Sequence, residues 1–499
     1  MSLNVVVVIS DSLRRDCLSC YGAPPWAARF PSGIGRVHTP HLDRFAEQAL
    51  IFDNAYIASF PTVPARNDIF TGRYTWTYKP WSPLSDDETT LSEVLNEAGV
   101  LTGIVADTPH PFAPGYNYQR GFQTWELIRG QENDRWRAAP EEIEWPAAAH
   151  KLRNPDRTMV QYLRNMHGRQ WEEDYFPART FREAARWLER NHQRQPFFLH
   201  VDNFNPHEPW DPPQYFTDLY DPGYEGDKVI YPRYGYCDYL SEAELDHCRA
   251  LYAGEATLVD RWFGYFLDRI ESLGLLDNTV VLFLSDHGFY LGEHGYIGKV
   301  IITDEFQQSI PLYPEVARIP LLAHLPPGMA RPGERVRNLV QTVDLMPTIC
   351  QLFGIPTPPS AQSHSFASVL RGEARANEEN SFVICSPTLS HPDIEVPHPT
   401  TRASVYRDNW LLVYGAQVDA VTDEETTSTV DSVLRSVKTI EQGPIRPKLY
   451  NLDQDPCASH DTLSDNRAVA EALHAGFVSF LEEKQVPEKH LRFFRNLNA

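Results

Sequence analysis

The sequence predicts an α/β fold in which a mostly parallel central sheet is covered by helices on both faces. Residues 4–10, NVVVVIS, form a continuous β-branched run, which is typical of a strand buried on both faces. Helical and apolar extended segments also alternate along most of the chain, as they do in sheets built from parallel strands. With 499 residues, of which 42% are hydrophobic, the chain can bury a large core.

The expected helices and strands follow from local signals. Thr39 and Pro40 open a helix, with the threonine as its cap and the proline at its first position. Gly99 ends a second helix. Three helix–strand pairs are expected, at 90–98 with 102–106, 181–190 with 196–201, and 242–273 with 279–284.

The pattern changes towards the C-terminus. Segments 403–406 and 410–414 flank a short polar turn, which predicts an antiparallel hairpin, and a helix is expected at 468–483. Residues 126–175 are rich in Trp, Arg and Glu and contain no clear strand. We therefore expect a main domain at 1–375, an insertion in it at about 126–175, and a small α+β subdomain with an antiparallel sheet at 376–499.

Composition limits the classes of partner. The formal net charge of -22 should repel nucleic acid and anionic membranes, so an anionic substrate would need a local group of positive charges. The first apolar run is too short for a signal sequence or a membrane span, and the seven cysteines are sparse. We expect a cytoplasmic protein that binds neither nucleic acid nor membrane. The aromatic and basic tail at 490–496 could serve as a subunit contact, so a homo-oligomer is possible.

Polar residues directly after two predicted strands could bind a metal. Asp11 follows the first strand, and Asp286 and His287 follow the strand at 279–284. Such side chains gather at the carboxyl edge of a parallel sheet, where oxygen and imidazole groups can share one divalent cation. Two alternatives stay open: Asp11 could cap the next helix, and Asp286 and His287 could form a polar turn without a metal.

A further candidate site lies where a helix begins near Thr62. Pro64 stands close to the first helical position, and Gly72 ends the helix. The free N–H groups of a helix start attract anions, and Arg66 would project near the same end. In the alternative, Thr62 only caps the helix and Arg66 pairs with a surface acid.

Three histidines and a lysine lie in loops that follow predicted strands. A single histidine is more often structural than catalytic. Several polar groups at the ends of different strands nevertheless indicate a shared site. The residues are His110, His207, His294 and Lys299.

These segments resemble the sulfatases of the alkaline phosphatase superfamily. Thr62, Pro64, Arg66 and the run 71–73 match the sulfatase signature in spacing, with Thr62 where a cysteine normally becomes formylglycine. Other matching segments are 11–22, 39–43, 206–209, 285–288 with Lys299, 314–320, 343–348 and 449–456. The resemblance covers about residues 4–460 and implies an alkaline phosphatase-like fold and a metal-dependent ester hydrolase.

The resemblance also implies roles for individual residues. Asp11, Asp286 and His287 would bind one divalent cation, and the Thr62 oxygen would complete the site. The mixed oxygen and nitrogen set favours manganese or zinc, with calcium or magnesium as alternatives. Catalytic roles would fall to Thr62, Arg66, His207, His294 and Lys299, and substrate contacts to His110, His207 and Lys299.

Departures from the sulfatase pattern favour phosphorus esters. Ser12 stands where many sulfatases have a second aspartate, and His287 where many have asparagine, which resembles the phosphonate monoester hydrolases and phosphodiesterases of the family. Threonine cannot become formylglycine, a conversion that starts from Cys or Ser. Water would therefore have to attack the central atom of a Thr62 ester, which is better precedented at phosphorus than at sulfur. We expect a small anionic phosphodiester or phosphonate monoester as substrate.

Other functions remain open from the sequence. One is a sulfate ester hydrolase that tolerates threonine, and another is a transferase in which an alcohol replaces water. A third, from another class, is a noncatalytic binding protein on a sulfatase fold, because the cysteine is lost.

Overall fold

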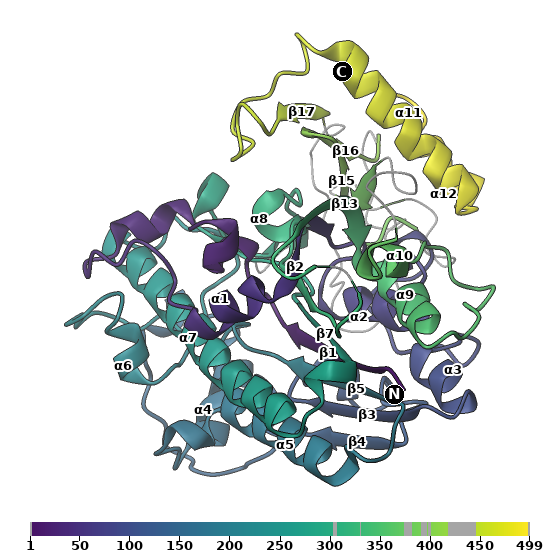
Figure 1. The fold of residues 1–499 in the computed structure, drawn as a ribbon. Helices are drawn as coiled ribbons and strands as arrows, with labels where there is room; N and C mark the ends of the chain where they lie inside the picture. Colours follow the sequence, from purple (N-terminus) through teal and green to yellow (C-terminus); the bar gives the residue numbers. More distant parts are fainter. Residues whose placement is uncertain are drawn as a thin grey trace.

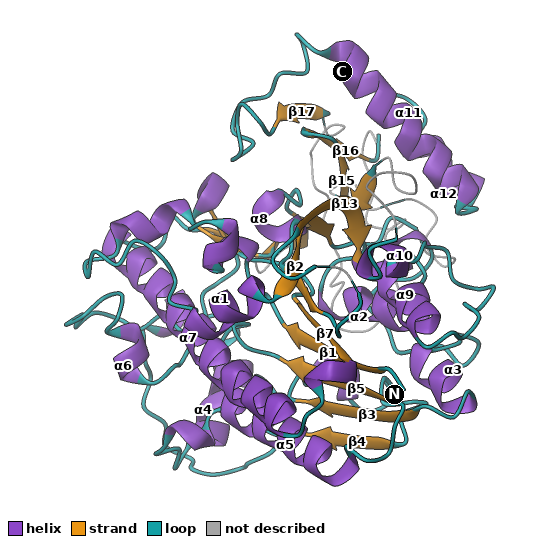
Figure 2. Ribbon diagram, viewed as in Figure 1, coloured by secondary structure: helices purple, strands orange, loops and turns teal. Residues whose placement is uncertain are grey.

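An eight-stranded sheet runs through the main domain of the computed structural model (Figures 1 and 2). The structure describes residues 2–302, 307–329, 331–373, 382–390, 397, 401–417 and 446–497. The strand order is β13-β2-β12-β7-β1-β5-β3-β4, and only β12 is antiparallel to its neighbours. The strands are β1 Asn4–Ser10, β2 Ala49–Tyr56, β3 Leu101–Ala106, β4 Thr124–Leu127, β5 Phe197–Asn203, β7 Thr279–Leu284, β12 Leu321–His324 and β13 Arg335–Gln341.

The predicted sheet is confirmed, with β1 and β7 at their predicted bounds. β1 lies between β5 and β7, and all seven of its residues are buried. Its valines alternate between two hydrophobic cores, which explains the unbroken apolar run. The expectation of no strand at 126–175 is wrong at the start of that segment, because Glu126 and Leu127 belong to the edge strand β4.

Helices cover both faces of the sheet. α1, α5 and α7 pack on one face with Val6 and Val8, whereas α2, α3 and α9 pack on the other with Val5 and Val7 (Figure 1). None of the described helices is long and apolar enough to cross a membrane. The helices are α1 Pro40–Glu47, α2 Thr62–Thr71, α3 Leu91–Glu97, α4 Val160–Met166, α5 Phe176–Asn191, α6 Gln214–Thr217, α7 Glu242–Ser272, α8 Pro314–Ala317, α9 Leu345–Leu352 and α10 Ala367–Leu370.

The start of α1 differs from the prediction. The side chain of Thr39 makes no capping hydrogen bond. The carboxylate of Asp260, in the middle of α7, instead accepts hydrogen bonds from the backbone N–H groups of Leu42 at 2.6 Å and His41 at 3.2 Å. A residue more than 200 positions away therefore satisfies the helix start.

A second, antiparallel sheet with order β14-β15-β16-β17 follows near the C-terminus. α11 covers one of its faces (Figure 1), and the predicted hairpin and C-terminal helix are confirmed. The predicted boundary at 375/376 lies outside the described residues. The elements are β14 Val383–Cys385, β15 Arg402–Arg407, β16 Trp410–Gly415, β17 Lys448–Asn451, α11 Arg467–Glu483 and α12 Glu488–Leu491. Short strands elsewhere are β6 Gly235–Tyr236, β8 Tyr290–Leu291, β9 Tyr296–Gly298, β10 Val300–Ile302 and β11 Gln307–Ser309.

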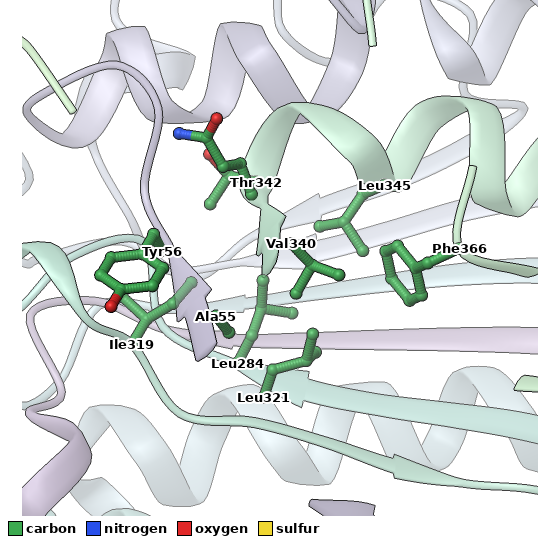
Figure 3. A pocket seen from close by; sticks show the side chains of 10 residues that line it. Ala55, Tyr56, Leu284, Ile319, Leu321, Val340, Thr342, Leu345 and Phe366 are labelled. Atoms are coloured by element: carbon green, nitrogen blue, oxygen red, sulfur yellow. The ribbon is translucent and has the colours of Figure 1, made fainter. Parts of the chain in front are cut away.

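A small cavity lies between the antiparallel part of the main sheet and α9 (Figure 3). Most of its lining is apolar, and it includes none of the residues proposed above for catalysis or metal binding. We interpret it as a packing defect. Its lining residues are Ala55, Tyr56, Leu284, Ile319, Leu321, Val340, Gln341, Thr342, Leu345 and Phe366.

Candidate active site

Three buried carboxylates meet at the carboxyl ends of adjacent strands. Asp11 follows β1, Asp202 lies in β5 and Asp286 follows β7. Because β1 pairs with both of the other strands, the three side chains converge on one site. All three residues are at most 1% exposed, so their charges must be balanced locally.

Asp11, Asp286 and His287 form a group that suits a divalent cation. One ligand atom from each lies within 4.8 Å of the others. His287 Nδ1 lies 2.9 Å from the Gly288 carbonyl oxygen, and donation of its proton there leaves the Nε2 lone pair free for a metal. Burial lowers the pKa of His287 to about 3, so the imidazole is neutral at physiological pH. Asp11 Oδ2 is buried and accepts no hydrogen bond of good geometry, although Arg66 Nη1 lies 3.0 Å from it, so the oxygen retains the capacity to bind a cation.

Thr62 faces this metal-ligand group. It is the first residue of α2, only 2% exposed, and its Oγ1 lies 3.4 Å from His287 Nε2. The loop before α2 is fixed by Asp68, whose carboxylate accepts hydrogen bonds from the Ser59 N–H at 2.6 Å and the Ser59 hydroxyl at 2.7 Å. The hydroxyl of Thr62 is therefore held beside both the ligand group and the positive end of a helix.

Arg66 joins the three carboxylates. It is fully buried and donates two hydrogen bonds to Asp202, at 2.6 and 2.7 Å. Its Nη1 also lies 2.8 Å from Asp286 Oδ2 and 3.0 Å from Asp11 Oδ2. The alternative in which Arg66 pairs with a surface acid is therefore wrong. The sequence reasoning missed Asp202, although a carboxylate near the end of a predicted strand was a usable signal.

Ser12 orients two carboxylates of the metal-ligand group. Its hydroxyl donates to Asp11 Oδ1 at 2.8 Å, and its backbone N–H donates to Asp286 Oδ1 at 2.9 Å. Its φ of +61° turns the backbone so that both bonds can form. The serine thus positions carboxylates rather than adding one of its own.

Lys299 and His207 lie at the same site. Lys299 Nζ is 3.9 Å from Asp11 Oδ1 and almost fully buried. The His207 ring stacks on Phe204 at 4.0 Å, with Nδ1 2.7 Å from the Glu208 carbonyl oxygen. Burial, with Lys299 as the next cause, holds the pKa of His207 well below its ordinary value. The imidazole is therefore neutral, whereas the lysine can supply positive charge.

His110 joins His207, whereas His294 has other neighbours. The ring of His110 lies 6.5 Å from that of His207, and its Nε2 lies 3.0 Å from Glu132 Oε2. His294 has a φ of +54° and stacks on Tyr313 at 4.0 Å. Its ring also lies 6.0 Å from that of Tyr290, and its Nε2 lies 3.7 Å from Glu315 Oε2.

The sequence reasoning also missed a charged cluster behind the two histidines. Arg153 lies over the rings of Tyr231 and Tyr234, at 4.2 and 3.9 Å from their centroids. It donates to Glu208 Oε1 at 2.7 Å and lies 3.4 Å from Glu132 Oε1. The segment 126–175 thereby contacts the residues that flank His110 and His207. No spacing in the sequence indicates this cluster.

Comparison with known proteins identifies the family. The chain matches the sulfatase family over residues 3–355. It belongs to that family. An arylsulfatase of Clostridium perfringens is 24% identical over 409 residues, which cover 74% of this chain and 79% of that protein. The multifunctional alkaline phosphatase superfamily protein of Trinickia caryophylli is 24% identical over 433 residues, with 74% and 77% covered.

Solved structures confirm the fold of this sulfatase-family chain. The phosphonate monoester hydrolase of Agrobacterium radiobacter superposes with a TM-score of 0.69 at 19% identity, covering 97% of this chain and 96% of that one. The phosphonate monoester hydrolase of Silicibacter pomeroyi superposes with a TM-score of 0.65 at 21% identity, covering 98% of this chain and 96% of that one. The predicted fold class and the prediction of a sulfatase-family hydrolase are thus confirmed. Sulfatases depend on a divalent metal, which agrees with the metal-ligand group.

Proposed function

We propose that this sulfatase-family hydrolase cleaves phosphodiesters or phosphonate monoesters through a covalent intermediate on Thr62. The observation that carries the proposal is the position of the Thr62 hydroxyl, at the start of α2 and 3.4 Å from His287 Nε2. Beside it lie the two carboxylates and the imidazole of the metal-ligand group. A nucleophile needs such surroundings because a free threonine hydroxyl is a weak one.

Asp11, Asp286 and His287 would hold the cation, with the Thr62 oxygen as a further ligand. A bound divalent cation supplies positive charge that lowers the pKa of a neighbouring hydroxyl and neutralises charge on an ester oxygen. The mixed set of two carboxylates and one imidazole favours manganese or zinc over calcium or magnesium.

The residues of this chain supply the rest of the reaction. Thr62 Oγ gives its proton to water and attacks phosphorus, an Oγ–P bond forms, and the P–O bond to the alcohol breaks. Lys299 and the free N–H groups at the start of α2 stabilise charge on the nonbridging oxygens. His110 or His294 gives a proton to the departing alcohol, and the neutral His207 orients an oxygen by hydrogen bonding. Water then attacks phosphorus, and the Oγ–P bond breaks. One proton of the water passes to the departing Thr62 oxygen, and the other restores the histidine that protonated the alcohol.

The choice of phosphorus rests on the chemistry of threonine. A formylglycine hydrate can release its ester by breaking the carbon–oxygen bond, and a threonine ester has no such route. Sulfate ester hydrolysis remains the second candidate, because an arylsulfatase of Clostridium perfringens is among the relatives. Transfer to an alcohol in place of water is a variant of either reaction.

The test compares wild type with Thr62→Ala and Thr62→Ser. We expect wild type to contain metal and to hydrolyse an aryl phosphodiester or phosphonate monoester faster than the matching aryl sulfate. Thr62→Ala should lose about 10³-fold or more in kcat while keeping its metal, because the nucleophile is gone. Thr62→Ser keeps the hydroxyl and should keep turnover.

Three outcomes would contradict the proposal in different ways. Substantial turnover by Thr62→Ala would exclude the threonine as nucleophile. Turnover of the sulfate ester alone would favour the second candidate. Absence of both metal and turnover would favour a noncatalytic binding protein on this fold.

A further inference from the structure

Arg402, the first residue of β15, is a mostly buried cation without an acidic partner. Its Nε is buried and makes no hydrogen bond. Within the part of the chain that the structure describes, no carboxylate forms an ion pair with it, and burial lowers its pKa. The chain has 67 acidic and 45 basic residues, so acids to pair with it are plentiful. A buried charge is normally paired, so Arg402, which has no acidic partner among the described residues, retains the capacity to bind an anion.

The face of β15 that carries Arg402 is turned to the main domain. Side chains alternate along a strand, so Arg402 shares its face with Ser404 and Tyr406. Tyr406 belongs to a core of the main domain, whereas Ala403 and Val405 pack on the other side with α11. The hydroxyl of Ser404 is also buried without a hydrogen-bond partner. Two polar groups on this face thus lack partners.

Four tyrosine side chains lie near enough to the Arg402 guanidinium to act on its charge. The groups that act on it electrostatically are the phenols of Tyr236, Tyr296, Tyr313 and Tyr450, which we call the tyrosine cluster. The hydroxyls of Tyr313 and Tyr450 lie 3.1 Å apart, and the rings of Tyr236 and Tyr296 lie 5.2 Å apart. Neutral phenols offer hydrogen bonds but no compensating charge. Tyr236 is 57% exposed, so the cluster reaches the surface.

The tyrosine cluster adjoins the metal-ligand group. Tyr313 stacks on His294, whose Nε2 lies 3.7 Å from Glu315 Oε2. The backbone of Glu315 in turn contacts Gly288, where an added Cβ would come within 1.9 Å of the Glu315 oxygen. Gly288 directly follows His287 of the metal-ligand group. The tyrosine cluster is thus linked to the metal-ligand group through His294 and Glu315.

We propose, resting on the function proposed above, that Arg402 and the tyrosine cluster bind an anionic substituent on the leaving group of the substrate. The guanidinium offers paired hydrogen bonds to a carboxylate, sulfate or phosphate oxygen. The exposed ring of Tyr236 offers flat apolar contact to a sugar or aromatic ring, and the hydroxyls of the cluster offer hydrogen bonds. Arg402 thereby selects the leaving group by charge, in a chain that otherwise repels anions.

The test uses two aryl phosphonate esters with the same reacting group. One carries 4-nitrophenol as leaving group and the other carries 3-carboxy-4-nitrophenol. We expect wild type to favour the carboxylated ester in kcat/KM. Arg402→Met should lower the ratio of the two kcat/KM values by about tenfold or more, mainly through the KM of the carboxylated ester, because a charge-assisted hydrogen bond is lost. Arg402→Lys, which keeps the charge, should lower this ratio of kcat/KM values by a smaller factor.

The matched control is Arg407→Met, at the other end of β15, where the side chain is 49% exposed. This variant should leave the ratio unchanged. An equal loss on both esters in Arg402→Met, or no loss, would overturn the proposal.

A binding measurement separates the proposal from the function on which it rests. Free 3-carboxy-4-nitrophenol should bind wild type at least tenfold more tightly than Arg402→Met, whereas free 4-nitrophenol should show no such difference. If neither ester is hydrolysed, the proposed function fails and this binding difference still decides for or against the anion site. Equal binding of the carboxylated phenol by both proteins would overturn it.

Discussion

Arg66 sets the charge balance of the candidate active site. Burial by itself raises the pKa of Asp202, but the Arg66 guanidinium holds that pKa well below its usual range. Asp11 and Asp286 share the same guanidinium. The three carboxylates and the two cations Arg66 and Lys299 leave one negative charge, since His287 is neutral. A divalent cation reverses that sign and prepares the site for an anionic substrate.

Asp202→Asn should therefore weaken both metal binding and catalysis. The substitution removes the bidentate partner of Arg66, whose charge then acts on Asp11 and Asp286 alone and competes with the cation. We expect metal affinity and kcat/KM each to fall by about 10- to 100-fold, the usual effect of altering a group that orients metal ligands. Calorimetric titration with Mn²⁺ measures the affinity, and turnover is measured at saturating metal.

Asp107→Asn is the matched control for that experiment. Asp107 is another buried carboxylate at a strand end, but it accepts from the Phe204 N–H at 2.6 Å and from Gln131 rather than from Arg66. The Asp107→Asn substitution should change metal affinity by less than about twofold, because Asp107 is not bonded to Arg66. Equal losses of metal affinity in both variants would contradict a specific role for the Asp202–Arg66 pair.

At the scale of elements, the long helix α7 fixes segments far from it in sequence. Its Tyr252 hydroxyl donates to the Ser12 carbonyl at 2.7 Å and accepts from the Arg14 N–H at 2.9 Å, which holds the turn after β1. About two helical turns further along α7, Asp260 caps the start of α1. Both contacts place polar side chains of a buried helix against backbone groups that would otherwise lack partners.

The Asp260 cap predicts a pH dependence of stability. Burial raises the pKa of Asp260 from 3.8 to about 7. Between these values the folded protein binds a proton that the unfolded chain does not, so the free energy of unfolding falls as pH rises. Asp260→Asn removes this titration. The stability of wild type relative to the variant should thus fall from about pH 4 to pH 7, by at most about 1.4 kcal/mol per pH unit.

Urea unfolding of both proteins at several pH values measures this difference. The comparison is made between two proteins at each pH, so titration of the other groups cancels. A difference that stays constant across the range would show that Asp260 keeps an ordinary pKa in the folded protein. A difference that grows in favour of wild type as pH rises would contradict the sign.

At the scale of the whole molecule, the sequence predicts strands better than their pairing. β1 and β7 were predicted to the residue, because unbroken apolar runs mark strands that are buried on both faces. β12 was not predicted, since its antiparallel place between β2 and β7 depends on long-range pairing that no local pattern records. The cap of α1 by Asp260 was missed for the same reason.

The candidate site divides in the same way. Asp11 and Asp286 directly follow strands, and Thr62 begins a helix, so local patterns indicated them. Asp202 could have been inferred from its place in β5. The Arg153 cluster could not, because its members come from segments with no periodic signal, and only the folded chain brings them together.

Metal binding should stabilise the molecule as a whole. The proposed ligands lie in the turns after β1 and β7 and at the start of α2, so a cation held by them would bind only the folded arrangement. A ligand that binds only the folded state raises the free energy of unfolding by about 2.7 kcal/mol at about 100 times its Kd. Adding Mn²⁺ to protein stripped with EDTA should therefore raise the melting temperature. Asp286→Asn, which lacks one ligand, should show little of that rise, and an undiminished rise in this variant would mean that the cation binds elsewhere.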